Sequence, residues 1–97
     1  MPAKVSVELL HSQLSPADLR RAFKLAATAL EQQLTTGLMP SPVMLNKRVR
    51  RWPAHEIERV LEARNVGLTD AEIRALVRRL HADRARRAAE LREVSNV

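Results

Sequence analysis

The chain has 97 residues, a formal net charge of +6 and no cysteine, and hydrophobic residues make up 45% of it. This composition excludes a disulfide framework and a thiolate zinc site, and it argues against a disordered chain. The length fits one small domain. Phe23 and Trp52 are the only aromatic residues, so the core must be aliphatic, and this composition favours helices.

The positive charge is distributed unevenly. Residues 1–46 hold four cations and three anions, whereas residues 47–97 hold thirteen cations and eight anions. A small basic domain typically binds a polyanion, although arginines can also simply solvate exposed helix faces. No secretory apolar run follows the first residues, and no stretch approaches the roughly 18 apolar residues of a membrane span. We therefore expect a cytoplasmic, nucleoid-associated protein without a membrane partner.

The first elements can be predicted from alternation and capping. Residues 1–13 form an N-terminal segment whose alternation of apolar and polar residues over 5–9 predicts a short strand. Ser15 is a good N-cap and Pro16 suits the first helical position, which predicts a helix that ends near Lys24.

A second helix is predicted from about Ala26 to Thr36, with Gly37 as its C-terminal stop. The tight junction between the two helices, at Lys24 and Leu25, is typical of a helix-turn-helix.

A basic hairpin is predicted directly after these helices. Two prolines, Pro40 and Pro42, force the backbone extended before a short strand from Val43 to Leu45 and a polar turn at Asn46-Lys47. The return strand is expected to carry four cations: Lys47, Arg48, Arg50 and Arg51. It is expected to end on Trp52, which we predict to be a core residue. A basic hairpin in this place is typical of the wing of a winged helix, although its arginines could also be merely solvated.

Two further helices are predicted in the remainder of the chain. Pro53 opens a third helix that runs out near residues 65–67, and Thr69 with Glu72 forms the capping box of a fourth. The apolar stripe of the fourth helix degrades beyond Leu80. We therefore expect residues 84–97 to fray or to contact a partner.

The predicted fold class is mainly α with a small β-hairpin: a winged helix-turn-helix plus a C-terminal helix. The N-terminal segment (1–13), a DNA-binding domain (14–66) and a C-terminal helical extension (67–97) are the expected parts of the chain.

From Lys24 to Trp52 the chain resembles, without a gap, the AlpA-like proteins, which are relatives of the MerR-type and excisionase-type winged helices. Their pattern is Gly-x-Phe-Pro-x-Pro-Val-x-Leu, a basic turn, and Trp before a helix. The matching positions here are Gly37, Met39, Pro40, Pro42, Val43, Leu45 and Trp52. The resemblance extends over roughly residues 8–80. It implies a regulator from a prophage or integrative element, either a transcription factor or a recombination directionality factor that bends DNA for an integrase.

The chain departs from this family in the predicted recognition helix. Where the family has Ser-Arg-Ser-Thr and then Tyr-Arg, this chain has residues 26–29 (Ala-Ala-Thr-Ala) and then Glu31-Gln32. Base reading is therefore expected from uncharged side chains, and phosphate contacts from the wing. The candidate DNA-binding residues are Thr28, Gln32, Gln33, Thr35, Lys47, Arg48, Arg50 and Arg51. The polar residues among them could also form an ordinary solvated face.

Catalysis, a metal and a cofactor are not expected. His11, His55 and His81 lie on different elements without partners at ligand spacing, and no phosphate-binding glycine loop is present. We therefore predict a sequence-biased regulator that binds double-stranded DNA and associates with further copies on it, with an integrase or RNA polymerase as other candidate partners. The alternative is a protein-interaction module, either an anti-activator or a subunit that meets DNA through a partner.

Overall fold

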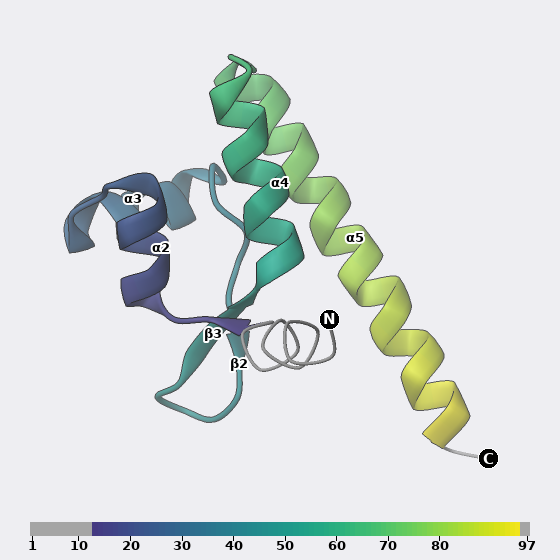
Figure 1. The fold of residues 1–97 in the computed structure, drawn as a ribbon. Coiled ribbons are helices and arrows are strands. Elements are labelled where there is room, and N and C mark those ends of the chain that lie inside the picture. The colour runs from purple at the N-terminus through teal and green to yellow at the C-terminus, as the bar shows by residue number, and fades with distance from the viewer. Residues whose placement is uncertain (1–12, 96–97) are drawn as a thin grey trace, which may run out of the picture.

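A small three-stranded antiparallel sheet accompanies four helices in the computed structural model, which describes residues 13–95 (Figure 1). In chain order the elements are β1 (Gln13–Leu14), α2 (Pro16–Phe23), α3 (Ala27–Thr36), β2 (Val43–Met44), β3 (Arg50–Pro53), α4 (Ala54–Asn65) and α5 (Asp70–Ser95). The prediction of a mainly helical chain with a small hairpin is thus confirmed. The strand predicted over residues 5–9 lies outside the described residues.

The first two helices begin and end as their local sequence dictates. The Ser15 hydroxyl accepts from the Asp18 N–H at 3.2 Å, and the Asp18 carboxylate accepts from the Ser15 N–H at 2.9 Å. The pKa of Asp18 lies below its ordinary value. The largest cause is the hydrogen bond from the Ser15 N–H, and the second is the hydrogen bond from the Arg21 side chain. Lys24 ends α2 with a φ of 55°, in the left-handed region, which confirms the predicted tight junction with α3.

Gly37 ends α3, also as predicted. Its φ is 79°, a backbone conformation that residues with a Cβ rarely adopt. Its N–H donates to the carbonyls of Gln33 and Leu34. The chain then extends through Pro40 into the hairpin.

β3 is the central strand of the sheet. It pairs antiparallel with β1, where Leu14 lies opposite Trp52, and with β2, where Met44 lies opposite Arg50. The β1 strand was not predicted, because two residues are too short to show an alternation.

The prediction that Lys47 and Arg48 belong to the return strand is wrong. β3 begins at Arg50, and residues 45–49 form a loop. The Asn46 side-chain oxygen accepts from the N–H groups of Arg48 and Val49, at 2.9 and 3.0 Å. These two donors are therefore used within the turn and cannot pair with β2.

In the described part of the chain, two apolar clusters form the core, and the half-buried Phe23 packs against both. The first cluster comprises Leu19, Leu30, Met39, Trp52 and Ile57, and the second comprises Val60, Ala63, Ile73, Val77 and Leu80. Trp52 is fully buried and donates its indole N–H to the Pro40 carbonyl at 2.7 Å, which confirms its prediction as a core residue.

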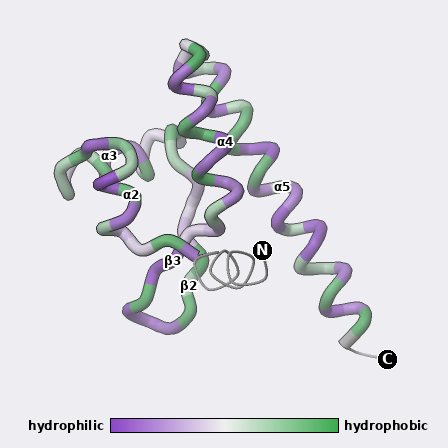
Figure 2. The backbone as a smooth tube through the Cα atoms, in the orientation of Figure 1, coloured by the Kyte–Doolittle hydropathy of each residue, from purple (hydrophilic) through white to green (hydrophobic). Residues whose placement is uncertain are grey.

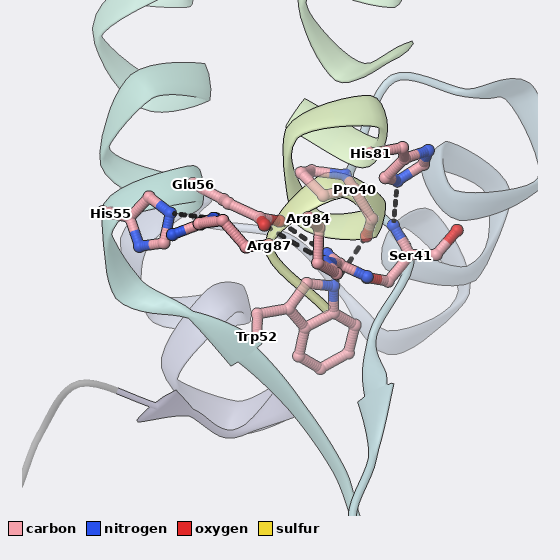
Figure 3. Close-up of polar contacts among 8 residues, drawn as sticks. All are labelled: Pro40, Ser41, Trp52, His55, Glu56, His81, Arg84 and Arg87. Carbon is pink, nitrogen blue, oxygen red and sulfur yellow. Dashed lines mark hydrogen bonds and ion pairs between the residues drawn. The ribbon is translucent and has the colours of Figure 1, made fainter. Parts of the chain in front are cut away.

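The predicted capping box of α5 is present, since Thr69 and Glu72 exchange hydrogen bonds of 2.9 and 3.2 Å. Fraying from residue 84 is not observed, because α5 continues as one helix to Ser95 (Figure 1). Arg84 is anchored to the fold, since it pairs at 2.5 Å with the carboxylate of Glu56, a side chain with no exposed surface. Arg84 also donates to the Ser41 carbonyl at 2.8 Å (Figure 3).

Replacement of Trp52 by alanine is expected to lower the free energy of unfolding by about 3–5 kcal/mol. The change opens a cavity in the first cluster and leaves the Pro40 carbonyl without its donor. Urea unfolding followed by circular dichroism measures the loss. Trp52→Phe, which keeps most of the apolar volume, should cost less than Trp52→Ala, and equal midpoints for wild type and Trp52→Ala would contradict the burial.

Replacement of Arg84 by alanine leaves the Glu56 carboxylate buried without a cation, and is expected to cost about 3–5 kcal/mol of stability. Arg86→Ala is the matched control, because within residues 13–95 Arg86 pairs only with the exposed carboxylates of Asp83 and Glu90. Such exposed pairs contribute up to about 1 kcal/mol. Similar unfolding midpoints for the two variants would show that the Glu56–Arg84 pair does not stabilise the fold.

Candidate nucleic-acid interface

One face of α3 is polar and points to solvent. Thr28, Glu31, Gln32 and Thr35 share this face, because Glu31 and Gln32 each lie three or four residues from Thr28 and from Thr35, and all four are exposed. The opposite face carries the buried Leu30 and so fixes the helix to the core. The polar face is therefore held on a rigid support and is open to a ligand.

Gln33 is placed differently from the other predicted base readers. It is half-buried, and its side-chain oxygen accepts from the Arg64 guanidinium at 2.5 Å. The geometry therefore gives Gln33 a bond inside the fold, while its proposed contact with a base stays a prediction.

Arg64 is a structurally important residue that sequence reasoning did not single out. It also donates to the Leu38 carbonyl at 2.7 Å, and its guanidinium carbon lies 4.7 Å from the centre of the Phe23 ring. Burial lowers its pKa from the ordinary value. The available signal was its spacing, since Arg64 follows Ile57 and Val60 at helical intervals on the inward face of α4.

The four predicted wing cations fall into two pairs. Lys47 and Arg48 lie in the hairpin loop, are exposed, and make no ion pair within the described part of the chain. The tip of this loop is hydrophilic (Figure 2). By contrast, Arg51 is half-buried and donates to the Arg50 carbonyl at 2.7 Å.

Arg50 connects the hairpin to α3. Two of its nitrogens donate to the two carboxylate oxygens of Glu31, both at 3.1 Å, and its guanidinium carbon lies 5.6 Å from the centre of the Trp52 ring. Bidentate pairs of this kind fix orientation as well as distance. The contact therefore holds the start of β3 against the polar face of α3 and compensates the only charge on that face.

The histidines of the described region serve the fold. His81 accepts from the Ser41 N–H at 2.9 Å through Nε2, and Nε2 of His55 lies 3.1 Å from an Arg87 nitrogen (Figure 3). Within residues 13–95, no three His, Asp or Glu side chains gather in a way that could hold a metal ion. None of the described helices combines the length and the apolar character that crossing a membrane requires.

Comparison with protein-family models, with curated proteins and with solved structures finds no match to this chain.

The different surroundings of the neighbouring residues Gln32 and Gln33 give a stability test. Gln33→Ala removes a partner from the half-buried Arg64 and is expected to cost about 1 kcal/mol. Gln32→Ala, on the exposed face, should stay within about 0.5 kcal/mol of wild type. Thermal or urea unfolding of both variants provides the measurement, and the reverse order of stabilities would contradict the assigned positions.

Proposed function

We propose that this chain binds double-stranded DNA as a winged helix-turn-helix domain, with α2 and α3 as the helix-turn-helix and the β2–β3 hairpin as the wing. The bidentate contact between Arg50 and Glu31 carries the proposal. It sets the basic hairpin beside the exposed polar face of α3, so that one duplex can meet both surfaces.

The two surfaces would have different tasks. Between Ala27 and Thr36, α3 contains no lysine or arginine, so its exposed residues can contribute base contacts but little phosphate attraction. Gln32 can pair bidentately with an adenine in the major groove, and Thr28 and Thr35 can contact either bases or phosphates. Lys47 and Arg48 at the loop tip supply charge to the DNA backbone.

We further propose that the protein regulates transcription, or the direction of recombination, of a mobile genetic element. The resemblance of residues 24–52 to the AlpA-like proteins supports this role. A single small module with an uncharged reading helix reaches specific affinity more readily when several copies bind side by side. An integrase or RNA polymerase would be the further partner on DNA.

A second candidate function is that of a protein-interaction module. The observation in its favour is the distal part of α5, where Val94 is 73% exposed. A partner protein, or another copy of this chain, could cover this side chain. The salt dependence of binding separates the two functions, because only phosphate contacts release counterions in proportion to their number.

The wing is expected to supply affinity without specificity. Lys47→Ala combined with Arg48→Ala should weaken binding to every duplex and lower the slope of log K against log salt by about 0.9 for each phosphate contact that is lost. Fluorescence anisotropy on a random duplex over a range of salt concentrations measures the slope.

Arg92→Ala is the matched control for these wing substitutions, because Arg92 is an exposed cation near the far end of α5. We expect its slope to equal that of the wild-type protein. If the double wing variant has the wild-type slope of log K against log salt, the hairpin is not part of the DNA interface.

A further inference from the structure

An open hollow of about 300 Å³ lies between the C-terminal end of α3 and the first half of α5. Its polar lining comprises Thr35, Thr36, Arg74, Arg78 and His81, with no carboxylate among them. A second hollow, between α4 and α5, differs in charge, because its arginines are accompanied by the carboxylates of Glu62 and Glu72. The α3–α5 hollow therefore offers an uncompensated positive charge.

A hydrogen bond orients Arg74 toward the C-terminal end of α3. Its Nε donates to the Thr36 carbonyl at 2.8 Å, and its Cγ lies 3.8 Å from the point where a Cβ on Gly37 would stand. The bond to Thr36 satisfies a carbonyl at the negative end of the α3 dipole. The terminal guanidinium nitrogens of Arg74 make no other hydrogen bond or ion pair within residues 13–95, so they remain donors for a ligand.

Two more donors line the same hollow. Arg78 follows Arg74 by one helical turn, is exposed, and has no carboxylate partner in the described region. His81 accepts from the Ser41 N–H through Nε2, so its proton must reside on Nδ1, the nitrogen turned away from Ser41 in Figure 3. Burial, and then the charge of Arg84, lower the pKa of His81, which keeps the ring neutral with Nδ1–H as a donor.

We infer that this hollow is a phosphate site that receives one phosphodiester of the DNA backbone while α3 lies in the major groove. Two arginine guanidinium groups together with a neutral N–H donor are suited to binding a phosphate. The hollow is continuous with the polar face of α3, because Thr35 is the last residue of that face and also lines the hollow. Arg50 of the wing contacts α3 at Glu31, and Thr35, the first residue of α3 that lines the hollow, lies about one helical turn further along. Two sources of phosphate contact thus flank a reading helix that has no cation of its own. This inference rests on the proposed DNA binding.

The test compares Arg78→Ala with Arg79→Ala on a random duplex, by anisotropy over a range of salt concentrations. Arg79 is the matched control, because it is the next residue of α5 and lines the other hollow, with Glu62 and Glu72. We expect Arg78→Ala to lower the slope of log K against log salt by about 0.9, whereas Arg79→Ala keeps the wild-type slope. Both side chains are exposed, so unchanged thermal unfolding should accompany both substitutions.

Each alternative outcome has a separate meaning. If the wild-type protein binds the duplex and Arg78→Ala has the same slope as Arg79→Ala, the phosphate site is refuted while the proposed function stands. If the wild-type protein does not bind the duplex, both fail. A titration with inorganic phosphate at constant ionic strength tests the other source of the ligand. Suppose that inorganic phosphate saturates the wild-type protein while Arg78→Ala leaves DNA binding unchanged. The hollow then binds a free phosphate compound, and its assignment to the DNA backbone is overturned.

Discussion

The carboxylate of Glu56 is fully buried at the start of α4, and Arg84, 28 residues further along the chain, supplies its cation. A buried carboxylate without such a partner would be strongly unfavourable, so this pair and the second apolar cluster together hold α5 against α4. Arg84 also binds the Ser41 carbonyl, and Trp52 binds the carbonyl of the preceding residue, Pro40 (Figure 3). The segment that leads into the hairpin is therefore held from two sides, which places the hairpin relative to the helices.

In the candidate interface, the residues suited to base contacts and the cations suited to phosphate contacts lie on different elements. The single charge on the exposed face of α3, Glu31, is compensated by Arg50 from the hairpin. In the proposed complex, the neutral face of α3 would contact bases, while cations at the loop tip and on α5 contact phosphates. Such a division makes non-specific affinity and sequence preference separable by mutation, since phosphate contacts carry no direct sequence information.

Arg64 and Phe23 explain how a domain with two aromatic residues keeps its parts together. Phe23 packs against both apolar clusters, and the Arg64 guanidinium lies over its ring while donating to Leu38 and Gln33. These contacts join α2, the end of α3, and α4 at one point. Small domains bury a modest fraction of their surface, so a single side chain that connects several elements contributes disproportionately to their alignment.

The sequence by itself determined the local structure. Ser15, Gly37 and the Thr69–Glu72 capping box set helix ends because each satisfies backbone groups within a few residues, and Trp52 was identified as core because a lone indole before an amphipathic helix has much apolar area to bury. Only the tertiary structure decided the rest. The pairing of β1 with β3, the Glu56–Arg84 and Glu31–Arg50 contacts, and the engagement of Gln33 by Arg64 join residues far apart in the chain. The helical spacing of Arg64 indicates an inward position, but the separation between two partners along the chain is not periodic. The sequence alone therefore does not show which charged residue pairs with which.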